Sequence, residues 1–196
     1  MDIVGDNTES HHPLLRSSKN YQVRIMRPAE WEVLREALDP DMQKICTAQL
    51  LTGTRYAELE RIRDNPNWIE GSFVYLPHGS MLKEKAKQRE REIRLSDMGK
   101  IVIQSLYEVE GQLPALAAYD MRLMRMSGKV LDGHHINNKS FRKTWESWLV
   151  FYYPDRALQV ALSQGHASIT QYMYYLNLSF DESDRKVMRK WVEGWA

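Results

Sequence analysis

The sequence predicts a mainly α-helical fold with a small antiparallel β-sheet (α+β), and three observations predict this class. Apolar residues recur at helical spacing through most of the chain from residue 28 onward. Short alternating segments between residues 68 and 95 are the only convincing strands. Serine, aspartate, glycine and proline stand where helices should begin and end. The 196 residues suffice for one hydrophobic core of ordinary size.

Three helices are expected before the first strand. Pro28 suits the first turn of a helix that an Asp-Pro pair stops at residue 39. The next helix carries Met42, Ile45, Cys46 and Leu50 and ends at Gly53, because glycine readily adopts the conformation that follows a helix C-terminus. A short third helix begins at Arg55 and reaches about residue 63.

The predicted strands cover residues 68–69 and 72–76, followed by a hairpin with arms at 81–86 and 90–95. This hairpin has the densest basic run in the chain, comprising Lys83, Lys85, Lys87, Arg89, Arg91 and Arg94. Two interpretations stay open: lysines that protect a sheet edge from pairing, or a ribbon that lies against a phosphate backbone. Glutamates between the basic residues allow only part of such a ribbon to face DNA.

The rest of the chain reads as helical. Ser96 caps a helix whose inner side carries Ile101, Val102 and Leu106. A helix starting near Asn138 has Phe141, Trp145 and Trp148 on one side. Further helices are expected at residues 157–163, 169–175 and 181–195. Residues 1–27 are polar and without periodicity, and we expect them to form a flexible tail or linker. The folded domain is expected to cover residues 28–196.

The overall composition narrows the function only slightly. Apolar residues make up 43% and charged residues 27% of the chain, and 27 Lys and Arg balance 26 Asp and Glu, so net charge does not point to a polyanionic partner. The single cysteine, Cys46, lies in an apolar helical pattern and is expected to be a buried, inert thiol in a reducing compartment. No apolar run approaches the roughly 20 residues of a membrane span, and the N-terminus lacks signal-peptide features. A cytoplasmic protein is expected.

Five positions outside the hairpin could carry chemistry. Arg55 and the pair Lys139 and Arg142 place cations at helix starts, which the helix dipole disfavours, and a phosphate ligand would explain them. His166 follows a glycine and precedes Tyr175 by nine residues. Each also has a structural explanation, as a surface cation or a packed aromatic. A tyrosine nucleophile, with a pKa near 10, needs neighbouring cations, and the chain lacks the carboxylate clusters of a metal nuclease.

The order of these motifs resembles the catalytic domain of the tyrosine recombinases, the phage integrase family. TGTRYAEL resembles its first arginine box, KEKAKQREREIRL its lysine hairpin, KSFRKTWESWL its second arginine box, and SQGHASITQYMYYLNL its histidine and tyrosine boxes. The resemblance covers about residues 28–180. One departure is Lys139, which stands where the family usually has histidine. Integrases of archaeal viruses and plasmids, and the related type IB topoisomerases, share this replacement.

The resemblance implies a chemistry in which Tyr175 attacks a DNA phosphodiester to form a 3′-phosphotyrosyl link. Tyr174, eight residues after the histidine, is the rival nucleophile. Arg55 and Arg142 would clamp the non-bridging oxygens, and His166 and Lys139 would support proton transfer. Lys85 would protonate the leaving 5′-oxygen, with Lys83 and Lys87 as alternatives. Lys83, Lys87, Arg89 and Arg91 are the expected DNA-binding residues, and no metal or cofactor is expected.

The same resemblance implies double-stranded DNA as the partner and a homo-oligomer, a tetramer, on that DNA. It also implies a protein of a virus or mobile element that acts in the cytoplasm of the host cell, at the nucleoid. Residues 181–195 could be exchanged with a neighbouring protomer or dock on their own core. No counterpart of the N-terminal DNA-clamping domain that most family members carry is expected in these residues, which would be either a catalytic fragment or a minimal single-domain member. Two alternatives remain: DNA relaxation of the type IB topoisomerase kind, and a DNA-binding accessory protein that has lost cleavage.

Overall fold

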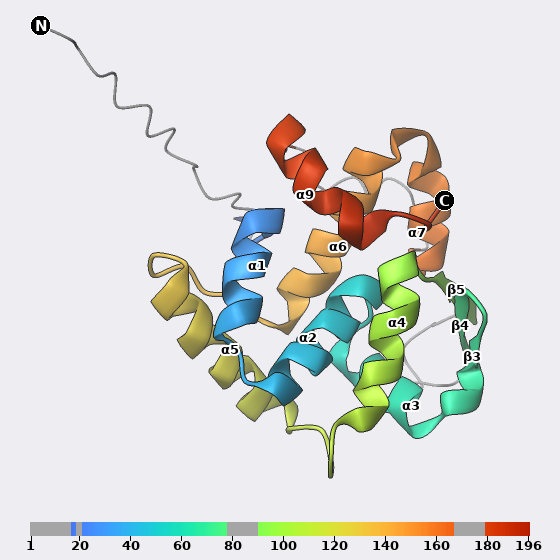
Figure 1. Cartoon of the computed structure of the whole chain (residues 1–196), viewed down its shortest axis with the longest axis horizontal. Coiled ribbons are helices and arrows are strands. Elements are labelled where there is room, and N and C mark those ends of the chain that lie inside the picture. Colours follow the sequence, from blue (N-terminus) through green and yellow to red (C-terminus); the bar gives the residue numbers. More distant parts are fainter. Residues whose placement is uncertain (1–16, 19–20, 78–89, 167–178) are drawn as a thin grey trace, which may run out of the picture.

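The computed structural model describes residues 17–18, 21–77, 90–166 and 179–196. Helices α2 (Pro40–Thr52) and α6 (Asn138–Tyr152) contact each other at the centre of the molecule. Around them pack α1 (Pro28–Ala37), α3 (Tyr56–Asp64), α4 (Asp97–Ser105), α5 (Leu116–Val130), α7 (Ala157–Ser163) and α9 (Glu182–Val192) (Figure 1). Short 3-10 turns follow α3, α4 and α6 at Pro66–Trp68, Leu106–Glu108 and Pro154–Arg156.

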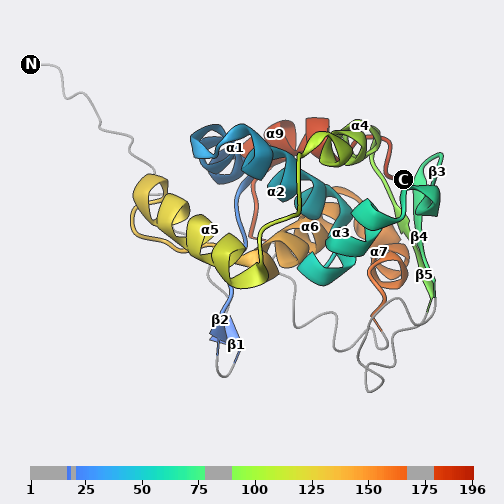
Figure 2. The same ribbon diagram turned by 90° about the horizontal axis from the view of Figure 1, so that it is seen from below.

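The helices lie on two sides of the central pair. Figure 2 shows α1, α9 and α4 along one side and α3 and α7 on the opposite side, with α2 and α6 between them. Two small antiparallel sheets complete the described part of the chain, a pair formed by β1 (Ser17–Ser18) and β2 (Tyr21–Gln22) and a three-stranded sheet. The predicted fold class, mainly helical with a small antiparallel sheet, is confirmed.

Helix ends follow the local chemistry that the sequence indicates. Asp39 accepts a hydrogen bond from the amide of Met42 at the start of α2. Gly53 ends this helix in the left-handed conformation, with φ +61°. Ser96 accepts from the amide of Gly99 and caps α4. The cap of α6 is Asn137, one residue before the Asn138 expected from the sequence.

Aromatic side chains fill the core between the helices. Trp31 meets Phe141 edge to face with ring centroids 5.9 Å apart, and Trp145 and Trp148 are fully buried. Helix α9 contacts α1, α4 and α6 of the same chain. Exchange of this helix with a neighbouring protomer stays a prediction, since a single chain does not test it. Ile101, expected on the inner side of α4, is exposed, and Ile103 is buried instead.

The three-stranded sheet has the order β3 (Ile69–Glu70), β4 (Phe73–Leu76), β5 (Arg91–Arg94), all antiparallel. Val74 pairs with Ile93, and both are buried. The described partner of β5 is β4, a pairing that the sequence did not indicate, and the hairpin predicted between residues 81–86 and 90–95 stays a prediction. Residues 81–86 lie outside the described part of the chain.

The packed part of the chain begins before residue 28. Val23, Ile25 and Met26 are buried. The amide of Met26 donates to Oγ1 of Thr144 (3.0 Å), and Nε1 of Trp148 donates to the Met26 carbonyl (2.9 Å). The five residues before α1 are thus anchored to α6, whereas the sequence places them in a flexible tail. The apolar residues of this short segment alternate irregularly with polar residues, so the sequence pattern does not indicate that the segment is buried.

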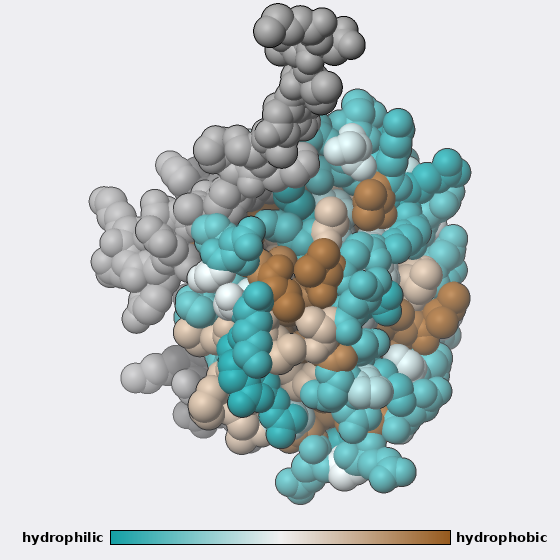
Figure 3. Space-filling model, turned by 60° about the vertical axis from the view of Figure 1, so that its left-hand side comes forward, coloured by the Kyte–Doolittle hydropathy of each residue, from teal (hydrophilic) through white to brown (hydrophobic). Residues whose placement is uncertain are grey.

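The face that carries α1 and α5 is mostly hydrophilic, with separate apolar patches (Figure 3). The exposed large apolar side chains of these two helices are Val33, Leu116, Met121 and Met124. Among the described helices, none combines the length and apolar character needed to cross a membrane.

Candidate active site

Arg55 immediately precedes α3 and is anchored by Glu58 in the first turn of this helix. The Arg55 amide donates to Oε2 of Glu58 at 2.9 Å, and its Nη1 donates to Oε1 of the same carboxylate at 3.0 Å. Glu58 is fully buried, whereas the Arg55 side chain is 54% exposed. The carboxylate at the helix N-terminus compensates the unfavourable arginine, and the exposed guanidinium remains accessible to an external anion.

Arg91 is a second arginine that binds the Glu58 carboxylate. Its Nη2 donates to Oε2 of Glu58 at 2.8 Å, and only 5% of its side chain is exposed. Alternation along β5 explains this position, because Arg91 and the buried Ile93 share the inner face of the sheet. The sequence interpretation included Arg91 among the expected DNA-binding residues. In the structure its side chain is buried against Glu58, and any contact of Arg91 with DNA stays a prediction.

The pKa of Glu58 reflects these neighbours. Burial alone would raise it, but the guanidinium of Arg91, with Arg55 and Arg142 adding to its effect, lowers the pKa from 4.5 to about 2. Glu58 is therefore a carboxylate over the whole physiological pH range, and it interacts electrostatically with three arginines.

Arg142 projects from the first turns of α6 and is largely buried. Its Nε lies 3.0 Å from Oε1 of Glu146, one helical turn further on. Its Nη1 donates to the Gly53 carbonyl (3.4 Å) and its Nη2 to the Gln164 carbonyl. Burial lowers the pKa of this guanidinium and Glu146 opposes that effect. The planar group is thus held between the end of α2 and the turn that follows α7.

His166 stands after that turn, and its Nε2 lies 2.7 Å from Oε1 of Glu146 and 3.4 Å from Nη2 of Arg142. Gly165 creates the turn with φ +71°. A Cβ at residue 165 would approach Cδ of Arg91 to 2.8 Å, so a larger residue would displace the arginine as well as strain the backbone. Glycine before His166 thus has a packing reason independent of any motif.

Gln164 connects the two turns that carry the cations. Its Nε2 donates to the Thr52 carbonyl at 3.1 Å, and a Cβ at residue 53 would come within 2.5 Å of its Oε1. Gln164 is fully buried. The Thr-Gly turn before Arg55 and the Gly-His turn are therefore packed directly against each other.

Five of the predicted site residues thus have described positions, Arg91 on the inner face of the sheet among them. Arg55, Arg142 and His166 come together around two buried carboxylates, whereas Lys139 is exposed in the first turn of α6. Lys83, Lys85, Lys87, Arg89, Tyr174 and Tyr175 lie outside the described residues.

Glu58 and Glu146 are the site residues that the sequence interpretation missed. Both follow an arginine at helical spacing, at i+3 from Arg55 and i+4 from Arg142. Glu146 also lies between Trp145 and Trp148 in a buried part of its helix, where a lone carboxylate requires a partner. The i+3 and i+4 spacings from an arginine were the sequence features that could have identified the two carboxylates.

The charges of this cluster do not cancel. Three arginines, at positions 55, 91 and 142, face the two carboxylates, which leaves one unit of positive charge when His166 is neutral. An excess of this sign favours a phosphodiester, which carries one negative charge. Among the described residues, no group of His, Cys, Asp and Glu has the arrangement of a metal site. Cys46 is buried, and burial raises the pKa of its thiol to about 12.

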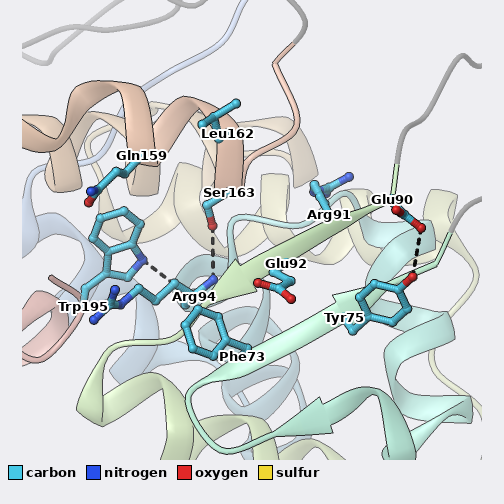
Figure 4. A pocket seen from close by; sticks show the side chains of 10 residues that line it. All are labelled: Phe73, Tyr75, Glu90, Arg91, Glu92, Arg94, Gln159, Leu162, Ser163 and Trp195. Atoms are coloured by element: carbon cyan, nitrogen blue, oxygen red, sulfur yellow. Dashed lines mark hydrogen bonds between the residues drawn. The ribbon is translucent and has the colours of Figure 1, made fainter.

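A pocket of about 530 Å³ lies between β4, β5 and α7 and reaches from the outward side chains of the sheet to Arg91 (Figure 4). In this pocket Ser163 of α7 accepts from the Arg94 amide (3.1 Å), and Nε1 of Trp195 donates to the Arg94 carbonyl (2.9 Å). Strand β5 is therefore fastened to α7 and to the end of the chain. This anchoring positions Arg91 on the inner face.

Comparison with family profiles and with curated protein sequences gives no match. The fold is similar to that of XerA recombinase in its crystal structure, with a TM-score of 0.62 and 15% sequence identity. The similarity covers 85% of this chain and 64% of the XerA chain. At this identity the likeness establishes the fold alone.

Proposed function

We propose that this chain is a site-specific DNA recombinase or integrase of the tyrosine recombinase type, which cleaves and rejoins double-stranded DNA. The observation that supports this most directly is the joining of Arg55, Arg142 and His166 in one cluster with excess positive charge. These residues come from three motifs far apart in the sequence. The fold shared with XerA recombinase adds independent support.

In the proposed reaction, the phenolic oxygen of Tyr175 attacks the phosphorus and the bond to the 5′-oxygen breaks. Lys85 gives its proton to this leaving oxygen, and Arg55 and Arg142 bind the non-bridging oxygens of the pentacoordinate phosphorus. His166 and Lys139 support proton transfer and phosphate binding. The phosphotyrosyl link retains the energy of the phosphodiester, so a 5′-hydroxyl can later attack it and restore the DNA strand.

The arginines suit this task for physical reasons. A planar guanidinium presents paired N–H donors to two phosphate oxygens, which an ammonium group does not. The exposed Arg55 is accessible to DNA, and Arg142 is already oriented by Glu146 and two carbonyl groups. This preorganisation avoids rearrangement cost when charge develops on the phosphate. A tetramer on DNA, with or without exchange of α9, forms part of the proposal.

Covalent trapping tests the proposal without a known target sequence. Short duplexes with a randomised centre and a nick opposite it are incubated with the protein and EDTA, and adducts that resist SDS are isolated and sequenced. We expect adducts from the wild type and from Tyr174→Phe, and none from Tyr175→Phe. Peptide mass spectrometry should locate the DNA on Tyr175.

Other outcomes identify the alternatives. If Tyr174→Phe abolishes the adduct and Tyr175→Phe does not, the assignment of the nucleophile is wrong. DNA binding without any adduct would identify an accessory DNA-binding protein and refute the recombinase. Relaxation of a supercoiled plasmid without paired sites would identify a topoisomerase activity instead.

A further inference from the structure

Glu146 is a carboxylate buried beneath the cation cluster, and no motif of the sequence assigns a role to it. Its side chain is 1% exposed, so it cannot reach a DNA phosphate itself. One oxygen, Oε1, lies 3.0 Å from Nε of Arg142 and 2.7 Å from Nε2 of His166. Any effect of Glu146 on a reaction must pass through these two neighbours.

The hydrogen bond between Glu146 and His166 has a defined direction. A carboxylate can only accept, so the proton lies on Nε2 of His166 and points at Oε1. An Nε2 that carries a proton cannot accept from Arg142, whose Nη2 donates to the Gln164 carbonyl instead. Neutral His166 is thereby confined to the Nε2–H tautomer, and its lone pair is on Nδ1.

Arg142 is oriented by the same oxygen. With Nε directed to Glu146 and Nη2 to the Gln164 carbonyl, the plane of its guanidinium is determined. The arrangement parallels other sites in which a buried carboxylate sets the tautomer and orientation of an imidazole and stabilises its charged form. In this chain the carboxylate additionally orients a guanidinium.

We propose that Glu146 is a positioning residue that fixes the Nε2–H tautomer of His166 and the plane of the Arg142 guanidinium, so that any proton His166 exchanges passes through Nδ1. This inference rests on the proposed function where it concerns the reaction. The tautomer and the orientation are properties of the free protein.

The charged groups around His166 come from several elements. Glu146 and Arg142 belong to α6, Arg91 to β5, and Glu58 with Arg55 to α3 and the residue before it. Glu146 is the carboxylate of this cluster that lies within hydrogen-bond distance of the imidazole in the described structure. Its replacement therefore changes the tautomer without removing a neighbour of Arg55.

The first experiment measures the tautomer in the full chain without DNA. The protein is labelled with ¹⁵N in its histidine rings, and the resonances of His166 are assigned by their loss in His166→Asn. Wild type should show the Nε2–H pattern, and so should Glu146→Gln, which retains an acceptor oxygen. Glu146→Met has a similar volume without an acceptor and should lose the pattern. A wild-type His166 in the Nδ1–H form would overturn the proposal.

The second experiment measures covalent trapping by the same proteins. Glu146→Met should slow adduct formation about 10- to 100-fold, as loss of an orienting partner does at other sites, and Glu146→Gln should be intermediate because only the charge is lost. Glu30→Gln is the matched control: it alters another carboxylate paired with a buried arginine, Arg24, outside the cluster and outside α9. Its trapping and its His166 spectrum should equal those of wild type.

The two measurements separate the inference from the proposed function. If the wild type forms no adduct, the recombinase assignment fails. The ¹⁵N spectrum of His166 in the free protein still tests whether Glu146 fixes the tautomer. If Glu146→Met does not fold, Glu146→Gln still tests the proposal: trapping at the wild-type rate by a Glu146→Gln protein whose His166 has changed to the Nδ1–H form would overturn it.

Discussion

Replacing Glu58 by glutamine should destabilise the protein in a strongly pH-dependent way. The carboxylate is fully buried and holds Arg91 and Arg55. Its pKa is about 2 in the folded protein, against an ordinary value of 4.5. At roughly 1.4 kcal/mol per pH unit, this difference corresponds to about 3 kcal/mol of folding free energy.

The direction of the pH dependence follows from the lowered pKa of Glu58. The stabilisation is complete above about pH 4.5, where the unfolded chain is also ionised, and it is lost as the pH falls toward 2. The wild-type advantage over Glu58→Gln should therefore be about 3 kcal/mol at pH 7 and about 2 kcal/mol at pH 3.5. At neutral pH this corresponds to a melting temperature lower by roughly 6–12 °C.

Urea denaturation of both proteins between pH 7 and pH 3.5 measures this difference. Glu193→Gln is the control, because it removes a carboxylate from an exposed ion pair with Arg189, and such pairs contribute at most about 1 kcal/mol. A constant difference between wild type and Glu58→Gln over this pH range would refute the reasoning. So would a loss no larger than that of Glu193→Gln.

Three further predictions follow from the same cluster and core. Arg142→Ala should lower the trapping rate by roughly 100-fold or more, and a wild-type rate would contradict the phosphate clamp. Gly53→Ala should reduce the melting temperature more than Gly71→Ala, since both have positive φ but only the first meets Gln164; the shared backbone cost is roughly 1–2 kcal/mol. Cys46, whose pKa burial raises to about 12, should react with a thiol reagent only after denaturation, and rapid reaction of the native protein would show that its thiol is accessible.

Local chemistry explains which parts of the fold could be predicted. The end of α2 was predictable because Gly53 adopts a left-handed conformation that disfavours other residues. The start of α4 followed from Ser96, which caps its own helix, whereas Asp39 was recognised only as the stop of α1 although it also caps α2. In each case the determining contact lies within a few residues of the boundary.

Strand pairing and buried charges were harder to predict because their partners are distant in sequence. The partner of β5 depends on a register between β4 and β5, which the alternation within β5 does not specify. The roles of Glu58 and Glu146 depend on Arg91 and His166, which arrive from other elements. Residues 23–26 appeared flexible because an irregular segment buried against α6 has no periodicity.

The hydrogen bond from Gln164 to the Thr52 carbonyl spans 112 positions of the chain. Closing so long a loop costs entropy before the contact can form. The turn at Gly165 makes local hydrogen bonds, from the amides of Gly165 and His166 to the carbonyls of Leu162 and Ala161, but its place beside the Thr-Gly turn depends on the distant contact. Arg55, Arg142 and His166 therefore come together only in chains in which these two segments have packed against each other. If the chain acts as proposed, cleavage of DNA would be restricted to fully folded molecules.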